Sequence, residues 1–308
     1  FIEGRGDKAA SSVVTAETPD EAKAAVESYA KRGYEGIKIY NSVKTELVPL
    51  LAKEAHAKNL LVIGHVPIHM LANEAVKAGY DGIEHINQVM LNFFATHDTD
   101  TRDTTRFTLV GEKMPAFDLD GKPTRELIEL FKKNKTVVDP TLVAFQDLIA
   151  GVPGKITPGL EPVVARLPSQ VQRGFLTGGL PLDGDKRDLY AKAWTKLLAA
   201  VKTLHKAKVH LVAGTDHIGG VMLHEELRLF VKAGISPLDA LRTATSEAAR
   251  GMRKTTFGSI AVGKRADLAI LTGDPITDIT TLRTIERTVR AGVVYTSAPL
   301  YESVGVKP

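Results

Sequence analysis

Four residues that can bind a metal ion or move a proton stand in or directly after short apolar runs. They are Lys38 in "GIKIY", His65 after "VIG", His85 after "GIE" and Asp216 after "LVAGT". Neutral imidazole and carboxylate groups are good ligands for zinc and similar ions. A buried ammonium is costly, and burial favours the neutral amine. A neutral lysine amine can react with CO2, and the resulting carbamate has two oxygens that can bridge two metal ions.

Helices alternate with these apolar runs. The sequence predicts strands at 36–40, 60–65, 81–87, 135–142 and 208–216, and helices at 18–33, 45–59, 69–79, 124–134, 222–233 and 237–250, with a mixed helical region at 143–206. The first helix has Thr18 as its cap, Pro19 in its first turn and Gly33 at its end. Alternating strands and helices form parallel β/α units, and barrels of such units carry their active sites at the C-terminal strand ends. We therefore expect the four residues to converge.

The predicted fold class is α/β, with a (β/α)8 TIM-type barrel that is incomplete in this chain. Residues 1–254 supply five β/α units, which we interpret as the last five of the barrel. After residue 255 the pattern changes to short strands with glycine turns, and "VRAGVVYT" predicts a hairpin that turns at Ala291-Gly292. We expect residues 255–308 to form part of a small β-sandwich domain.

Composition excludes several classes of function. The 308 residues are 44% hydrophobic without a long apolar run, so no membrane span is predicted. The net charge of +4 comes with no clustered basic patch, which argues against nucleic acid as a partner. Cysteine is absent, which excludes disulfides, thiol nucleophiles and zinc held by cysteine. The compartment stays open between cytoplasmic and periplasmic or secreted.

Each candidate ligand also has a structural interpretation. Taken alone, Lys38 is a solvated strand lysine, and His65 and His85 are core histidines with satisfied hydrogen bonds. Asp216 alone can be a helix N-cap. Their occurrence on four different strands, in or at the end of each, favours the metal site over these interpretations.

Three further residues are predicted to bind substrate. Tyr40 shares a strand face with Lys38, because side chains alternate with a period of two. His69 and His217 lie close to strand ends, where the pocket of a barrel is built.

The chain resembles the metal-dependent amidohydrolase superfamily, in particular its imidazolonepropionase-like and prolidase-like branch. The matching segments cover nearly all of residues 20–296 in the family's order, and they are "GIKIY", "VIGHVP", "AGYDGIEHINQ", "VHLVAGTD", "SPLDALRTATSEAARGM" and "GSIAVGKRADLAILTGDP". The resemblance implies a hydrolase that cleaves C–N bonds of amides, peptides or cyclic amides with metal-activated water. Its substrate would be a small molecule or a dipeptide.

The resemblance also implies a role for each ligand. Lys38 corresponds to a carbamylated lysine that bridges two divalent metal ions, for which zinc is the first candidate and iron, manganese and nickel stay open. His65 and His85 correspond to the ligands of the second metal. Asp216 corresponds to a ligand of the first metal that also serves as general base.

One family feature is missing from this chain. The His-x-His pair of the first barrel strand does not occur before Lys38, and the earliest histidine is His56. The resemblance therefore implies the C-terminal part of a longer enzyme. We expect it to form homo-oligomers or to associate with the missing N-terminal part, because open strand edges pair readily. Two alternatives stay open: a metal-free, non-catalytic remnant or association module, and a mononuclear metal deaminase, against which Lys38 argues.

Overall fold

The computed structural model describes residues 1–4 and 14–308. Its contacts divide the chain into two units, which we describe separately. The first unit consists of Phe1–Pro140 and Thr203–Leu211, and the second of Thr141–Lys202 and Val212–Pro308. Within the described ranges, no helix combines the length and apolar character that a bilayer span requires. The boundary that the sequence suggests near residue 255 stays a prediction.

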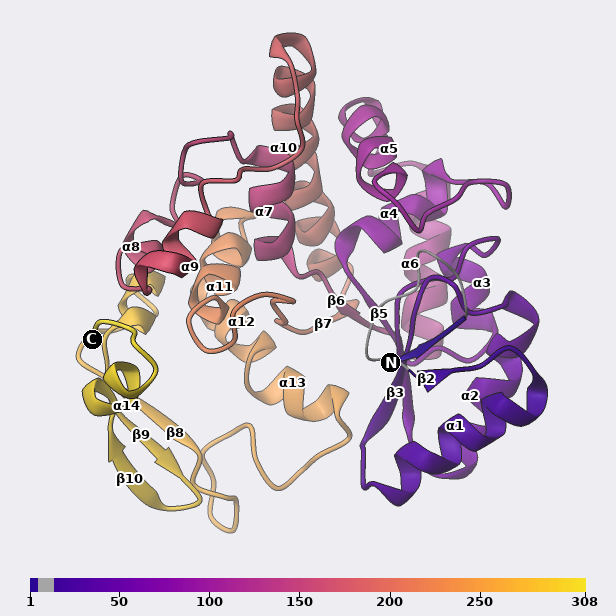
Figure 1. Cartoon of the computed structure of the whole chain (residues 1–308). Helices are drawn as coiled ribbons and strands as arrows, with labels where there is room; N and C mark the ends of the chain where they lie inside the picture. Colours follow the sequence, from indigo (N-terminus) through magenta and orange to yellow (C-terminus); the bar gives the residue numbers. More distant parts are fainter. Residues whose placement is uncertain (5–13) are drawn as a thin grey trace. The chain divides into compact units, whose positions relative to one another are not determined.

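Two parallel sheets form the centre of the first unit (Figure 1). One has the order β2-β1-β3-β4, with β1 at Ile2–Glu3, β2 at Val14–Thr15, β3 at Gly36–Ile39 and β4 at Leu61–Gly64. The other has the order β5-β6-β7, with β5 at Gly82–Glu84, β6 at Val137–Asp139 and β7 at His210–Leu211. Parallel strands joined through helices confirm the predicted α/β class. Closure into a (β/α)8 barrel and the β-sandwich stay predictions.

The helices of the first unit connect successive strands. They are α1 (Pro19–Lys31), α2 (Val48–Ala57), α3 (Ala72–Lys77), α4 (Ile86–Phe94), α5 (Thr105–Lys113) and α6 (Lys122–Asn134), with short 3-10 turns η1 (Thr45–Leu47) and η2 (Met114–Ala116). Helix α1 begins as predicted: the Glu21 backbone N–H donates to the Thr18 hydroxyl, and the Glu21 carboxylate accepts from the Thr18 backbone N–H. Gly33 follows its end at φ +74°.

Alternation along β3 and β4 separates a core face from a face that carries polar side chains. Ile37, Ile39 and Val62 are buried at 1%, 0% and 0% exposure. Lys38 and Tyr40 lie on the opposite face of β3 and its extension, and both are half-buried. Burial of the isoleucine face therefore fixes the direction in which Lys38 points.

Several predicted elements have other bounds in the structure, and three of these differences bear on the site or the second unit. The strand expected at 81–87 ends at Glu84, because His85 adopts φ 72° and α4 begins directly after it. The strand expected at 208–216 is limited to β7, and residues 212–216 carry no strand. The helix expected at 237–250 is interrupted at Thr245, whose φ −128° and ψ −94° are not helical.

The second unit combines helices with a small antiparallel sheet (Figure 1). The helices are α7 (Leu142–Ala150), α8 (Glu161–Val164), α9 (Ser169–Gly174), most of α10 (Gly184–Lys206), α11 (Leu223–Lys232), α12 (Pro237–Thr243), α13 (Ser246–Gly251) and α14 (Ser297–Ser303), with the 3-10 turn η3 at Ile279–Arg283. The sheet has the order β10-β9-β8, from β8 (Leu268–Leu271), β9 (Ile285–Arg290) and β10 (Val293–Thr296).

The predicted hairpin in this sheet is confirmed. Strands β9 and β10 pair antiparallel, with Arg290 opposite Val293. The two residues between them, Ala291 and Gly292, have φ values of 49° and 85°. Positive φ at both turn positions is the requirement of a two-residue hairpin turn that matches the strand twist.

Candidate metal-binding site

The side chains of His65 and His85 meet at the C-terminal ends of β4 and β5. Their Nε2 atoms lie 2.8 Å apart, and the two rings are nearly perpendicular, at 87°. Both residues are 4% exposed. Two imidazole nitrogens that converge away from water are suited to bind one metal ion together.

Asn41 fixes the tautomer of His65. The Asn41 Nδ2 atom donates to the backbone carbonyl of Thr101 at 3.3 Å, which leaves Oδ1 facing His65 Nδ1 within hydrogen-bond distance. Because Oδ1 is only an acceptor, the proton of His65 lies on Nδ1, and Nε2 carries the lone pair. A hydrogen bond to the remote ring nitrogen is the usual support of a histidine metal ligand.

Electrostatics keeps His65 neutral. Burial lowers the pKa of His65 well below its ordinary value, and the neighbouring His85, Lys38 and Arg106 lower it further. A neutral imidazole is the form that binds metal. With the proton of His65 on Nδ1, its Nε2 atom accepts the hydrogen bond from His85 Nε2–H. For both Nε2 atoms to become ligands, the His85 proton has to move from Nε2 to Nδ1.

The backbone holds the two histidines in place by unusual conformations. Gly64 precedes His65 at φ +135°, and a Cβ atom built on it would lie 2.2 Å from the carbonyl oxygen of Ile39. The His65 backbone N–H donates to that same carbonyl at 3.0 Å. Only glycine fits where β3 and β4 approach this closely. His85 itself has φ 72°, and its N–H donates to Asp139 O at 2.7 Å.

Lys38 lies on β3 and forms an ion pair with Glu84 at the end of β5. The two side chains are only 16% and 17% exposed, so the pair is largely removed from water. The attraction between the two charges offsets the free-energy cost of burying the lysine ammonium. It also sets a condition for carbamylation, because the ammonium has to lose a proton and leave the Glu84 carboxylate before it can react with CO2.

Tyr40 lies beside the histidine pair, as the strand period predicts. The centroid of its ring is 4.1 Å from that of the His65 ring, and the ring also stacks on the Phe1 ring at 5.5 Å with 7° between the planes. The Lys38 Nζ atom lies 4.9 Å from the centroid of the Phe1 ring. Tyr40, Lys38 and His65 are therefore neighbours.

The remaining predicted site residues lie elsewhere in the chain. His69 follows β4, is exposed, and donates from Nδ1 to the carbonyl oxygen of His97. Asp216 and His217 belong to the second unit. Asp216 is exposed and has φ 45°. His217 stacks on Phe175 at 5.5 Å, and burial lowers the pKa of His217 although nearby carboxylates oppose the shift.

The donor set of the first unit fits a metal ion in part. His65 and His85 present converging nitrogens, and Lys38 is ion-paired with Glu84, the residue before His85. Among the residues with described positions, no three or more His, Asp or Glu side chains form a group that could hold a metal ion. The histidine pair therefore needs a further ligand from the Lys38 side or from another segment.

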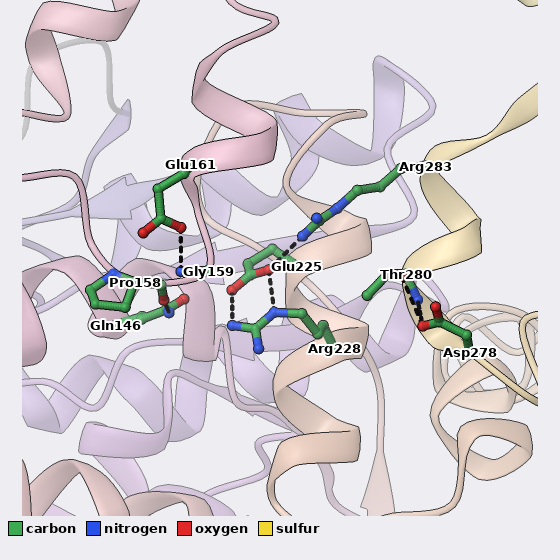
Figure 2. A network of polar contacts seen from close by, with 9 residues as sticks. All are labelled: Gln146, Pro158, Gly159, Glu161, Glu225, Arg228, Asp278, Thr280 and Arg283. Atoms are coloured by element: carbon green, nitrogen blue, oxygen red, sulfur yellow. Dashed lines mark hydrogen bonds and ion pairs between the residues drawn. The ribbon is translucent and has the colours of Figure 1, made fainter.

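The second unit holds a separate buried charge network, drawn in Figure 2. Glu225 on α11 is fully buried and binds two arginines: Arg228 Nε at 2.7 Å, and Arg283 Nη2 of η3 at 3.1 Å. The loop before α8 lies close to Arg228, because a Cβ atom on Gly159 would be 2.5 Å from Arg228 Nη2. Gln146 Nε2 donates to Pro158 O at 3.1 Å and holds this loop.

Three polar residues around the histidine pair have no strong sequence signal. Asn41 directly follows the apolar run at 36–40, and Glu84 is the last residue of the run at 82–84. Gln88 is the third residue of α4. The Gln88 Oε1 atom accepts from the Val66 backbone N–H at 3.3 Å. Their one sequence signal is position: each is a polar residue close to a strand end, where a buried polar group needs a partner.

Comparison with known proteins gives the family of this chain. The model of the "Amidohydrolase family" matches residues 12–295. Adenine deaminase of Klebsiella pneumoniae (strain 342) is 36% identical over 80 residues, which are 24% of this chain and 13% of that protein.

Solved structures share the fold. The bottromycin amidohydrolase AH aligns with a TM-score of 0.69 and 18% identity, over 100% of this chain and 67% of that one. A Xaa-Pro dipeptidase with methionine bound in its active site aligns with a TM-score of 0.59 and 21% identity, over 95% of this chain and 63% of that one. The chain thus spans less than two thirds of the dipeptidase.

Proposed function

Because this chain belongs to the amidohydrolase family, whose members generally use a divalent metal, we propose that it is the metal-binding part of a hydrolase that cleaves C–N bonds. The observation that carries the proposal is that the buried Nε2 atoms of His65 and His85 lie 2.8 Å apart. The hydrogen bond between His65 Nδ1 and Asn41 leaves a lone pair on His65 Nε2. Two imidazole nitrogens that converge away from water can bind one divalent metal ion together.

Each residue has a distinct role in this proposal. His65 and His85 hold one divalent ion, zinc being the first candidate. A bound divalent ion lowers the pKa of its water and polarises a substrate carbonyl. Asp216 accepts the proton of the attacking water and passes it to the leaving amine. Tyr40 lines the pocket beside His65, and His69 and His217 contact the substrate.

Lys38 is proposed to become a carbamate that bridges two metal ions. The ammonium first loses a proton, the neutral amine nitrogen forms a bond to the carbon of CO2, and a second proton leaves that nitrogen, so two protons are released and the side chain changes from cation to anion. That anion would lie beside the Glu84 carboxylate, and two like charges at this separation repel. Carbamylation therefore requires bound metal, and the two events are expected to occur together.

The substrate class follows from the family and its neighbours. We propose small amides, foremost dipeptides with proline at the second position, in line with the fold shared with a Xaa-Pro dipeptidase. Deamination is the second candidate, and the 36% identity to an adenine deaminase over 80 residues favours it. Both reactions hydrolyse a C–N bond, and they differ in the leaving group, which is an amino acid in one and ammonia in the other.

Metal content is the first test. We expect the purified chain to hold about one or two zinc ions per chain after dialysis, measured by elemental analysis. His65→Asn and His85→Asn should each lose zinc, whereas His205→Gln on α10 should keep it. Metal content below about a tenth per chain, in a chain whose melting shows that it is folded, would reject the site and favour a non-catalytic remnant.

Activity separates the two reactions. Release of proline from dipeptides and of ammonia from adenine can be measured on the same metal-loaded sample. Lys38→Ala should abolish dipeptide hydrolysis and the mass increase of one CO2, while a mononuclear deaminase would keep its activity. Glu84→Gln is the matched variant, because it removes the anion beside Lys38 but leaves the amine.

We further propose that this chain acts within a longer enzyme or an oligomer. The family's His-x-His pair has no counterpart before Lys38, and the chain spans 63% of the dipeptidase. Sedimentation measures the outcome directly: a stable, monodisperse monomer would contradict association.

A further inference from the structure

A cavity of about 390 Å³ lies in the first unit, between α3, α4 and α6. Helix α3 lines it with Asn73 and Lys77, which are four positions apart and therefore share one face of the helix. Helix α6 lines it with Glu126 and Leu130, which have the same spacing. Its volume lies within the range of small-ligand pockets, roughly 300–1,000 Å³. The residues that line it are different from those of the candidate metal site.

Two asparagine amides give the cavity a hydrogen-bond acceptor and a donor. The Asn92 Oδ1 atom accepts from the Asn73 backbone N–H at 2.9 Å, which leaves Nδ2 as the donor group of the Asn92 side chain. The Asn73 Oδ1 atom is buried and has no hydrogen-bond partner among the described residues. A buried acceptor without a partner is costly. Because the terminal torsion of asparagine is broad, a small rotation of the amide presents Oδ1 to a ligand in the cavity.

One cation and one anion line the cavity from different helices, Lys77 from α3 and Glu126 from α6, and both residues are exposed. Lys77 lies within electrostatic reach of Glu74, but each oxygen of that carboxylate already contacts His97 Nε2 at 3.1 Å. Glu126 Oε1 lies 3.6 Å from Lys122 Nζ in an exposed pair, and such pairs contribute little to stability. Both charges can therefore serve a ligand.

Apolar side chains form the rest of the lining. Leu127 of α6 is 4% exposed, and Leu130 lies one turn further along the same helix. Phe93 of α4 is held against the Phe117 ring, with 4.7 Å between the centroids. A ligand that fits this lining needs an apolar group beside its polar groups.

We infer that this cavity binds a free amino acid with an apolar side chain. The ammonium group of the ligand donates to Asn73 Oδ1 and pairs with Glu126. Its carboxylate pairs with Lys77 and accepts from Asn92 Nδ2. Its side chain packs on Leu127. A ligand with only one charge leaves either the cation or the anion of the lining without a partner. This site is independent of the proposed hydrolase chemistry.

Solvated helix faces offer a competing explanation. Lysine and glutamate are mostly exposed in proteins, so Lys77 and Glu126 alone do not indicate a site. The buried Oδ1 atom of Asn73 is different, because native structures pair nearly all of their buried polar atoms. Solvation of the helix surfaces does not account for this acceptor, whereas a ligand that donates to it does.

Titration calorimetry of the full chain with L-leucine, at about 0.15 M salt, tests the proposal. We expect saturable binding at one site per chain. Two analogues separate the charges: 4-methylpentanoate lacks the ammonium group of leucine, and 3-methylbutylamine lacks its carboxylate. Each should bind about tenfold or more weakly than leucine, because it loses one set of charge-assisted hydrogen bonds. Equal affinities for the three compounds would show that the charges play no part and would overturn the proposal.

Variants of the lining place the ligand in this cavity. Lys77→Gln and Glu126→Gln should each weaken leucine binding about tenfold. Lys53→Gln on α2 and Glu129→Gln on α6 remove the same charges from positions outside the cavity, and they should leave the affinity unchanged. All four positions are exposed, and a thermal melt confirms that each variant is folded. No saturable binding of leucine, unchanged affinity in the two cavity variants, or equal weakening in the controls overturns the proposal.

Discussion

Arg283 of η3 forms an ion pair with Glu225 of α11, 58 residues earlier, with 3.1 Å between Nη2 and Oε2 (Figure 2). Glu225 is fully buried, and the Arg283 side chain is 15% exposed. Arg228 binds the same carboxylate through two nitrogens. The pair joins the connection between β8 and β9 to the helical part of the second unit.

Substitution of Arg283 should lower stability. Arg283→Met keeps most of the stem but leaves Glu225 with one arginine. Because Arg228 still neutralises it, we expect a loss of about 1–3 kcal/mol in the free energy of unfolding, less than for a fully unpaired buried charge. Urea denaturation measures it. Arg290→Met, at an exposed position of β9, is the control, and an equal loss in both variants would show that the buried pair has no special weight.

Gly64 should tolerate no side chain. In Gly64→Ala the added Cβ would meet Ile39 O at 2.2 Å, so β3 and β4 have to separate and His65 moves. We expect a loss of about 3 kcal/mol or more in the free energy of unfolding. Gly33→Ala separates the causes, because Gly33 also has positive φ but open space around it. There the expected cost is only about 1 kcal/mol. Similar melting temperatures for the two variants would contradict the close approach.

The sequence alone predicts those parts of the fold whose signal is local. Helix α1 follows from Thr18, Pro19 and Gly33, and the β9–β10 hairpin from Ala291-Gly292. Strands β3 to β6 follow from short apolar runs between helices. By contrast, β1 contains only Ile2 and Glu3, too few residues for any periodicity, and it exists because it pairs with β3.

The site divides in the same way. Lys38, His65 and His85 were predictable because a chemically unusual residue in or after an apolar run stands out, and the structure brings them to one end of the first unit. The partners Asn41 and Glu84 could not be predicted in this way, because their contacts depend on how the strands align. Asn41 and His65 are 24 positions apart in the sequence, and Lys38 and Glu84 are 46 positions apart. Polar residues at strand ends are common, and only the fold selects those that meet.

Loss of the Asn41 amide should weaken metal binding. Asn41→Leu removes the acceptor that fixes His65 Nδ1–H, so His65 has to compete with its other tautomer and with rotation of its ring. We expect about a 10–100-fold loss of zinc affinity, measured by competition with a chromophoric chelator. Asn41→Asp keeps an acceptor and should retain the affinity. Equal zinc affinities of the wild type and Asn41→Leu would show that Asn41 does not support metal binding.

Acid should destabilise the second unit through His224. Burial, assisted by the positive charges of Arg283 and Arg166, lowers the pKa of His224 from 6.5 to about 4. In the unfolded chain the histidine keeps its ordinary pKa, so between these values the unfolded state binds more protons than the folded state. The free energy of unfolding therefore falls as the pH falls from 6.5 to 4, by at most on the order of 3 kcal/mol from this group.

His224→Gln isolates this contribution, because the carboxylates that also titrate are common to both proteins. The free energy of unfolding of wild type and variant is measured by urea denaturation from pH 7.5 to 4. As the pH falls, the wild type should lose more free energy of unfolding than the variant. Arg283→Met should shrink the effect, since removing one nearby cation raises the pKa of His224 toward its ordinary value. Parallel pH profiles of the wild type and His224→Gln would contradict the burial of a neutral imidazole at this position.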